Sequence, residues 1–196
     1  MEKRIVVLAG APSSTGITDP ATAVDDIDYL EAMYSYQGGA IGDYFDAQAV
    51  HPGGSANPPE TFLTDVPSAA SGWTDHPTFY FRHVEDVRQL MTEHELADKP
   101  IWITEFGWAT KNTTPGYEFG NQTSYQEQAD YIVGAMRWTS EHYPWVDAMF
   151  LWNLNFAQLK AKEGQPLHEQ ASFSILDGAG KPRPAYTAVQ RYLSGR

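Results

Sequence analysis

Four short apolar runs constrain the fold of this chain more than any other feature. Each is almost continuous in apolar and β-branched residues, and none alternates as a strand with one face in water would. Runs of this length and composition are typical of strands in a parallel sheet that is covered on both faces. The four runs are Ile5–Ala9, Phe45–Val50, Ile101–Thr104 and Val146–Trp152.

Helix-like segments follow these runs. In each of them, apolar residues recur at the three- and four-residue spacing of an amphipathic helix. Asp19 stands before Pro20 and is the predicted N-cap of the first helix. The sequence therefore predicts one α/β domain over residues 1–196, in which a strand and a helix alternate four times. The predicted helices are Pro20–Tyr36, Pro77–Leu96, Ser124–His142 and Pro184–Leu193.

A long loop follows the carboxyl end of every predicted strand. In parallel α/β folds, ligands and catalytic groups gather at this edge of the sheet. Gly and Pro are concentrated in these loops, as in the segment that begins at His51. We therefore expect the functional residues there. The loops are Ala11–Asp19, His51–His76, Glu105–Thr123 and Asn153–Arg183.

Composition excludes several classes of protein. The chain has 13 basic and 25 acidic residues, and its net charge of −12 makes nucleic acid and anionic membranes poor partners. It has no cysteine, which rules out disulfides and thiolate chemistry, and its six histidines lack metal-site spacing. Phosphate-binding loops and the nucleophile elbow of α/β-hydrolases are also missing from the sequence. We expect neither a metal nor another cofactor.

The start of the chain says little about localisation. The charged residues Glu2, Lys3 and Arg4 lead directly into an apolar run that is too short for the core of a signal peptide. No run of about 18 uncharged apolar residues, the length of a membrane span, occurs in the sequence. The localisation of the protein stays open.

Glu105 is the sharpest candidate for a chemical role. It ends a strand, and strand alternation places it on the same face as Ile101 and Ile103, with Trp102 and Thr104 on the other face. A carboxylate beside core isoleucines is costly unless it is used or paired. Glu105 is therefore either a functional carboxylate or a structural one that is bonded to a nearby arginine or amide.

A second group of candidates has the character of a sugar site. Trp152 ends a strand and offers a flat apolar face, and Asn153 and Asn155 offer hydrogen bonds. Trp108 is a second indole of this kind, and His51 ends the second strand on the ligand-facing side. The alternative is that these residues pack in the core. Aromatic loop residues that either line a cleft or only cover a loop are Trp73, Phe79, Tyr117 and Phe119.

These features together resemble the C-terminal half of a clan A glycoside hydrolase. This retaining group includes cellulases, β-glucosidases and β-xylosidases. The Thr-Glu-Phe-Gly-Trp stretch that ends at Trp108 resembles the seventh strand, the run that ends at Trp152 resembles the eighth, and the Pro-Ala-Tyr helix resembles the usual ending. The resemblance covers nearly the whole chain. It implies a (β/α)4 half of a TIM (β/α)8 barrel, with parallel strands and outer helices.

The resemblance also implies a function. Glu105 corresponds to the nucleophile, Trp152 to the platform on which the sugar stacks, and His51 to a polar contact near the site. The implied activity is retaining hydrolysis of O-glycosyl bonds in β-linked gluco- or xylo-configured saccharides. Clan chemistry needs no cofactor or metal. Related full-length enzymes are commonly secreted.

Two departures from the family pattern affect the implied mechanism. The acid/base of the family is a glutamate that follows an asparagine, and this sequence contains no Asn-Glu pair. The family often has His-x-Tyr after strand six, whereas here Gly53 takes the place of the tyrosine after His51. Carboxylates on or near the loops that could substitute for the acid, each more often a solvated charge, are Asp46, Asp75, Glu118 and Glu163. His51 is a further substitute.

A half barrel would have two open edges and an interior face in water. We therefore expect a homodimer, or a missing N-terminal half, to complete the ring. Alternatives to a glycosidase are a non-catalytic carbohydrate-binding protein and an inactive barrel fragment that is stable as an oligomer. A flavodoxin-like doubly wound domain is less favoured, because it would need a phosphate-binding loop.

Overall fold

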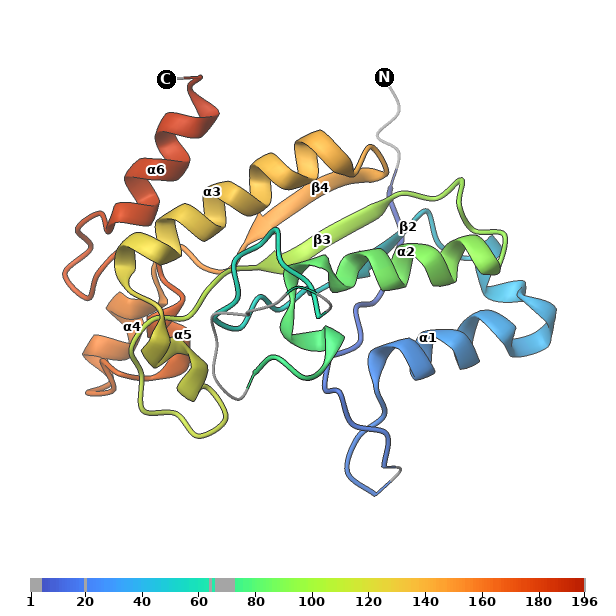
Figure 1. Ribbon diagram of the computed structural model, residues 1–196, viewed down its shortest axis with the longest axis horizontal. Coiled ribbons are helices and arrows are strands. Elements are labelled where there is room, and N and C mark those ends of the chain that lie inside the picture. Colours follow the sequence, from blue (N-terminus) through green and yellow to red (C-terminus); the bar gives the residue numbers. More distant parts are fainter. Residues whose placement is uncertain (1–4, 20, 64, 66–72, 196) are drawn as a thin grey trace.

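The computed structural model describes residues 5–19, 21–63, 65 and 73–195. Over this part of the chain, four parallel strands form one sheet in the order β1-β2-β3-β4 (Figure 1). Gln48 pairs with Ile101 across β2 and β3, and Ile103 pairs with Met149 across β3 and β4. The predicted parallel α/β arrangement is confirmed. The strands are β1 (Leu8–Ala9), β2 (Ala47–Val50), β3 (Ile101–Phe106) and β4 (Val146–Leu151).

Helices connect and follow the strands. None of the helices in the described residues is both long and apolar enough to cross a membrane. The α-helices are α1 (Asp26–Ser35), α2 (Val84–Glu93), α3 (Tyr125–His142), α4 (Phe156–Lys162), α5 (Glu169–Ser172) and α6 (Pro184–Leu193). Short 3₁₀ helices are η1 (Tyr36–Gly38), η2 (Ala40–Asp43), η3 (Pro77–Phe79), η4 (Phe81–His83) and η5 (Glu118–Gln122).

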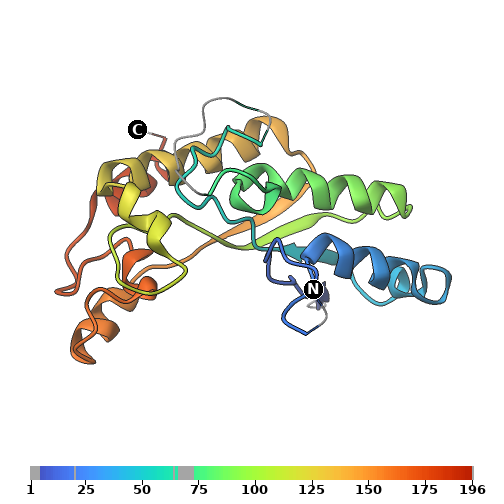
Figure 2. The same ribbon diagram turned by 60° about the horizontal axis from the view of Figure 1, so that its bottom comes forward.

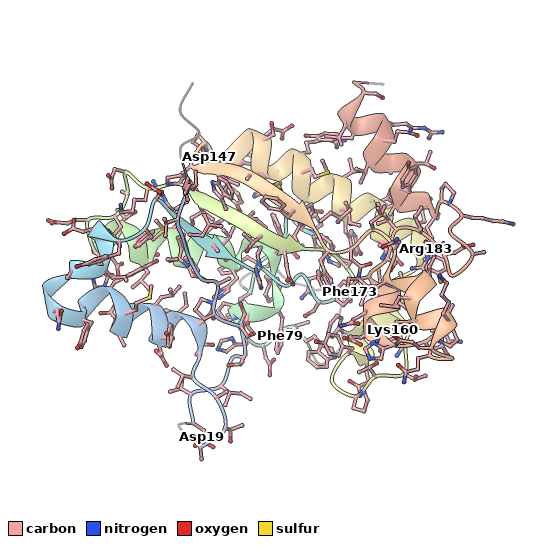
Figure 3. The ribbon with its side chains drawn as sticks, turned by 180° about the vertical axis from the view of Figure 1, so that it is seen from behind. Asp19, Phe79, Asp147, Lys160, Phe173 and Arg183 are labelled. Atoms are coloured by element: carbon pink, nitrogen blue, oxygen red, sulfur yellow. The ribbon has the colours of Figure 1, made fainter. Side chains whose placement is uncertain are left out.

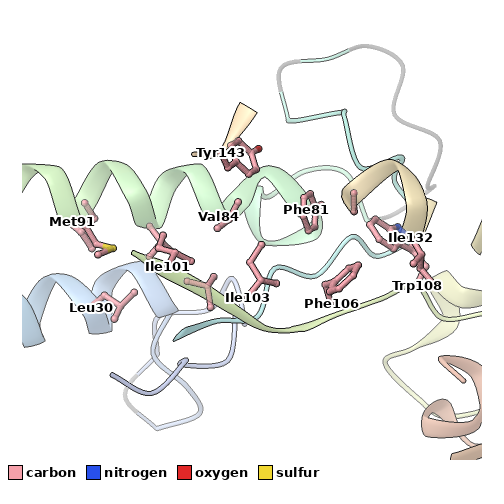
Figure 4. Close-up of a cluster of buried hydrophobic side chains, with 14 of the residues drawn as sticks. Leu30, Phe81, Val84, Met91, Ile101, Ile103, Phe106, Trp108, Ile132 and Tyr143 are labelled. Atoms are coloured by element: carbon pink, nitrogen blue, oxygen red, sulfur yellow. The ribbon is translucent and has the colours of Figure 1, made fainter. Parts of the chain in front are cut away.

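The main core lies between one face of the sheet and the helices α1, α2 and α3 (Figure 4). Ile101 and Ile103 of β3 are fully buried there, beside side chains such as Leu30 of α1, Val84 of α2 and Ile132 of α3. Burying an aliphatic side chain contributes about 1.5–3 kcal/mol. The apolar residues that recur at helical spacing in the sequence are therefore on the side of each helix that packs against the sheet.

The opposite face of the sheet is open (Figure 3). Trp102 of β3 and Phe150 of β4 lie together there, with ring centroids 6.0 Å apart, and Phe150 is 49% exposed. The sheet does not close on itself: β1 and β4 are its two edges. The described chain is thus an open (β/α)4 half barrel, with its helices on the outer side.

The first helix begins later than predicted. Asp25 is the N-cap of α1, and its side chain accepts a hydrogen bond from the backbone N–H of Ile27 at 3.1 Å. The Asp19 carboxylate instead accepts hydrogen bonds from Ala21 N and Thr22 Oγ1, which hold a turn. Asp19 is therefore not the cap of α1, because a local turn uses its oxygens. Pro20 lies outside the described residues.

The second predicted helix is interrupted. Tyr80 has an extended backbone (φ −122°, ψ 141°), and it separates η3 from η4. The α-helix proper is Val84–Glu93, shorter than the predicted Pro77–Leu96. By contrast, α6 has the predicted bounds, and α3 begins one residue after Ser124. Ser124 is the N-cap of α3 and forms a capping box with Glu127.

A buried histidine joins α1 to α2. Nε2 of His83 lies 2.9 Å from Oδ2 of Asp26, and Nδ1 lies 2.8 Å from Oδ2 of Asp86. Burial by itself would lower the pKa of His83, but the two carboxylates outweigh it and raise that pKa to about 9. The protonated His83 therefore links α1 to α2 through ion pairs with Asp26 and Asp86, and both helices cover the sheet.

Candidate active site

A cavity of about 400 Å³ opens at the carboxyl ends of β2 and β3 and next to the end of β4. The loops that follow β3 and β4 gather at this end of the sheet (Figure 2). Phe173 lies at the same end, opposite Asp147 near the start of β4 (Figure 3). The residues that line the cavity are His51, Pro52, Gly53, Glu105, Phe106, Gly107, Tyr117, Trp152, Glu169, Gln170 and Phe173.

Glu105 reaches this cavity because β3 does not alternate regularly to its end. The pairing of β3 with β4 is irregular between Ile103 and Phe106, and Phe106 joins Ile103 in the core with 4% exposure. The Glu105 side chain is 43% exposed and lines the cavity. The predicted shared face of Glu105 and the isoleucines is therefore wrong: the irregularity turns the carboxylate out of the core.

His51 is the polar neighbour of Glu105. It follows β2, and its Nδ1 lies 3.9 Å from Oε2 of Glu105. The contact is an ion pair only when the imidazole is protonated. The structure thus brings together two of the three residues that the family resemblance placed at the site.

Trp152 forms one wall of the cavity. Its backbone N–H donates to the carbonyl oxygen of Phe106 at 2.8 Å, its ring packs against Phe156, and its peptide bond with Asn153 is cis. Gly107 passes so close that a Cβ there would overlap the carbonyl oxygen of Trp152. The glycine of the Phe-Gly-Trp stretch is therefore needed for this close approach of two chain segments.

Tyr117 enters the cavity from the loop after β3. Its pKa is raised, first by burial and then by the negative charges of Glu169 and Glu105. Tyr117 thus lines the cleft that the aromatic loop residues suggested. Trp73 instead packs edge-on against Phe79 and Phe119, which cover the loop.

Three residues suggested as sugar contacts are placed elsewhere. Trp108 is fully buried, and its Nε1 donates to the carbonyl oxygen of Asn57 at 2.9 Å, so it is a core residue. Asn153 is 5% exposed, and its amide donates to the carbonyl oxygen of Gln170 at 2.9 Å, which holds the loop after β4. Asn155 is exposed but is not among the residues that line the cavity. The predicted direct sugar contacts of Trp108 and Asn153 are corrected to structural roles.

Of the predicted substitutes for the acid, His51 lines the cavity and the four carboxylates do not. Oδ2 of Asp46 accepts the backbone N–H of Val7 at 2.9 Å, before the start of β2, and Glu163 pairs with Lys160 on the surface. Glu118 begins η5 and Asp75 lies in the loop before η3, and neither lines the cavity. Among the described residues, no group of three or more potential metal ligands comes together.

Sequence reasoning missed Glu169, Gln170 and Phe173, which complete the cavity. No motif marks them, because they belong to the long loop after Trp152 and reach the site only when α4 and α5 fold. Thr114 and Ser174 hold this loop, because Oγ1 of Thr114 accepts the backbone N–H of Glu169 and Oγ of Ser174 donates to Oδ1 of Asn153, and no motif marks them either.

The fold and the site together define a class of protein. An open (β/α) half barrel carries a carboxylate and an indole at the carboxyl ends of neighbouring strands, which is the arrangement of the catalytic end of a (β/α)8 barrel. The sequence profile of the glycosyl hydrolase catalytic core matches residues 45–180. The chain belongs to this family.

Solved structures support the fold. The chain is similar to a family 39 glycoside hydrolase from Bacteroides cellulosilyticus WH2, with 20% identity, a TM-score of 0.54, and coverage of 86% of this chain and 30% of that one. A family 128 (subgroup II) endo-β-1,3-glucanase from Sorangium cellulosum has 17% identity and a TM-score of 0.52, with coverage of 96% and 54%. Fungal β-1,4-galactanases give 16% identity and a TM-score of 0.51, with coverage of 85% and 45%. The chain thus spans about a third to a half of these structures. No curated protein sequence matches it.

Proposed function

We propose that this protein is a retaining glycosidase in which Glu105 is the nucleophile. The observation that carries the proposal is the position of Glu105. Its carboxylate ends a central barrel strand, turns out of the core and faces a cavity walled by Trp152, in a chain of the glycosyl hydrolase catalytic core family. The proposed substrates are β-linked gluco- or xylo-configured saccharides.

In the proposed first step, a carboxylate oxygen of Glu105 attacks the anomeric carbon of the sugar. A carbon–oxygen bond forms to the enzyme while the glycosidic bond breaks, and its electron pair leaves with the departing oxygen. That oxygen needs a proton unless it is a stable anion. Water then releases the sugar from Glu105, with a base that takes the proton of the water.

The proposed partner supplies what this chain lacks. In retaining enzymes the second carboxyl group lies about 5–5.5 Å from the nucleophile. We propose that a second copy of this chain, or a separate N-terminal half, covers the open face that carries Trp102 and Phe150. In a homodimeric ring, the partner's fourth strand would bring amides rather than a carboxyl group to the acid position, so we expect slow turnover of substrates with poor leaving groups.

A second candidate function is carbohydrate binding without chemistry. It is favoured by the combination of an indole wall at Trp152 with polar lining groups and no assigned proton donor. Glu105→Gln separates the two functions, because a binding protein keeps its affinity for the sugar while an enzyme loses its rate. The third alternative, an inactive fragment, predicts neither binding nor rate.

The test is intact mass spectrometry after incubation with 2,4-dinitrophenyl 2-deoxy-2-fluoro-β-glucoside and the matching β-xyloside. Dinitrophenolate leaves without acid assistance, so the reagents report on the nucleophile alone. We expect a single adduct that maps to Glu105 and is missing in Glu105→Gln, with Glu141→Gln on the exposed surface of α3 as the matched control. Folded protein that gains no adduct from either reagent would contradict the proposal.

A further inference from the structure

Gln170 lines the same cavity as Glu105 and Trp152, and neither the family resemblance nor the sequence analysis gave it a role. It is the second residue of α5, which forms within the long loop after β4, and it is half-buried. A half-buried polar side chain in a cavity wall is either paired within the protein or available to a ligand. The hydrogen bonds of Gln170 distinguish these two roles.

The backbone of Gln170 is held by three hydrogen bonds. Its N–H donates to Nδ1 of His168 at 3.2 Å. Its carbonyl oxygen accepts Nδ2 of Asn153 at 2.9 Å and Oγ of Ser174 at 3.3 Å. Asn153 directly follows Trp152 in the chain, so one of these bonds fixes Gln170 relative to the indole wall. The backbone alone therefore keeps Gln170 in the cavity wall, and its side chain is not needed for that.

The side-chain amide of Gln170 has no such partner. Within the part of the chain that the structure describes, neither its oxygen nor its nitrogen makes a hydrogen bond, and neither atom is closed off from the surface. An amide has one acceptor oxygen and an NH₂ group with two donors, so this side chain offers both kinds of hydrogen bond. In ligand sites, a few such polar groups in a mostly apolar lining fix the orientation of the ligand.

The other walls of the cavity suit a sugar. Besides Trp152, the rings of Tyr117 and Phe173 line it, and these two rings meet edge-on with centroids 6.3 Å apart. The apolar C–H face of a pyranose packs on an aromatic ring, while its hydroxyl groups point outward around the sugar ring. Each hydroxyl both donates and accepts. An amide beside the aromatic walls can therefore bond two neighbouring hydroxyls of one sugar.

We propose that Gln170 is a substrate-binding residue, which orients the sugar stacked on Trp152 by donating to one of its hydroxyl groups and accepting from the next. This inference rests on the proposed function for the position of the sugar. It gives the loop after β4 a share in recognition that the strand ends alone do not supply. It concerns binding and not bond cleavage, so the two can be tested separately.

The experiment measures binding in the Glu105→Gln protein, which lacks the proposed nucleophile. Ligand-observed NMR titrations use cellobiose, xylobiose and laminaribiose as probes, and we expect at least one of them to bind. Adding Gln170→Met replaces the amide by an apolar side chain of similar length. It should weaken the bound probe about tenfold, the loss expected for two neutral hydrogen bonds, and leave the melting temperature unchanged.

A second measurement separates direct contact from a structural role. Analogues of the bound probe that each lack one hydroxyl group form a double-mutant cycle with Gln170→Met. We expect two adjacent hydroxyl groups whose removal weakens binding to the Glu105→Gln protein at least about threefold each. In the protein that also carries Gln170→Met, removal of the same two groups should have little effect, because their partner is already gone.

Gln165→Met is the matched control. Gln165 lies in the same loop, is exposed and is not among the residues that line the cavity, so its substitution should leave the affinity unchanged. Gln170→Ala, checked by thermal melting, serves if Gln170→Met does not fold. An unchanged affinity after substitution of Gln170, equal losses for every analogue in both proteins, or no bound probe at all would overturn the inference.

The covalent labelling of Glu105 distinguishes the two failures. If Glu105 is labelled but Gln170→Met binds like its parent, the glycosidase proposal stands and the binding role of Gln170 falls. If binding depends on Gln170 but no labelling is seen, the sugar contact stands and the chemistry falls.

Discussion

The two faces of the sheet contrast sharply. On the helix-covered face, Ile101 and Ile103 are fully buried and meet three helices. On the open face, Trp102 meets Phe150, which remains 49% exposed. Both faces use large apolar side chains, so composition alone does not tell them apart. The difference teaches that burial against the helices stabilises one face of the sheet, while the apolar side chains of the other face stay partly exposed in the described residues.

The two tryptophans at the ends of β3 and β4 repeat this contrast. Trp108 is enclosed by the core, where it packs against Phe81 and Tyr131, whereas Trp152 forms a wall of the cavity. Two indoles that look equivalent in the sequence therefore have different surroundings: Trp108 is a core residue, and Trp152 lines the cavity of the proposed site.

The largest expected effect is a loss of stability from a substitution in the core. Trp108→Ala removes a fully buried indole and should lower the free energy of unfolding by about 3–5 kcal/mol. Trp152→Ala is the matched substitution on the cavity side, with an expected loss of about 1 kcal/mol and a loss of sugar binding. Urea unfolding of both variants checks the ranking, and equal losses would contradict the assignment of the two indoles.

The next effect concerns the ion pairs of His83, which link α1 to α2. The folded pKa of His83 is about 9, above its ordinary value of 6.5. Its contribution to stability is therefore fully present below pH 6.5 and is lost as the pH rises to about 9. The free energy of unfolding should fall by a few kcal/mol across this window. His83→Gln should remove most of this pH dependence in urea unfolding; a variant with the parental pH profile would exclude His83 as its source.

A smaller effect tests how the covering helix begins. The Ser124 side chain accepts the backbone N–H of Glu127 at 3.1 Å, and Ser124→Ala should cost about 1 kcal/mol of stability. Glu141→Gln, exposed near the end of the same helix, is the control and should change stability by less than about 0.5 kcal/mol. Thermal melts of the two variants give the comparison. A Ser124→Ala melting temperature equal to that of the control would contradict a stabilising role of this cap.

The smallest effect on the stability of the isolated chain belongs to the open face. Phe150→Ser should change it by less than about 0.5 kcal/mol but weaken the proposed association of two copies. Tyr29→Ser, at a 52% exposed site on α1, is the matched control and should leave association unchanged. Sedimentation velocity over a range of concentrations checks both. A parent chain that stays monomeric throughout would rule out the homodimer.

Much of the fold was predictable because its signals are local. Continuous apolar runs predicted four parallel strands, and apolar spacing predicted the helices Ser124–His142 and Pro184–Leu193 to within one residue of their observed bounds. Errors fell where local signals compete. Asp19 and Asp25 both have the chemistry of a cap, but the carboxylate of Asp19 holds a local turn and Asp25 caps α1.

The site was predictable only in part. Glu105, His51 and Trp152 lie at strand ends, where the parallel topology itself brings them together. Trp108 and Asn153 lie at strand ends too, yet the turn of the chain after β3 and the loop after β4 bury them. Glu169 reaches the cavity only when α4 and α5 fold, and no sequence pattern predicted its position there.

The sequence by itself determined the alternation of strands and helices, the family of the chain and the strand that carries Glu105, because these depend on short-range periodicity and a compact motif. The tertiary structure decided which way Glu105 points, which indole faces the cavity and which second carboxylate joins it. A single pairing irregularity between Ile103 and Phe106 reverses the face of a side chain. The physical reason is that facing and burial depend on contacts between segments far apart in the chain.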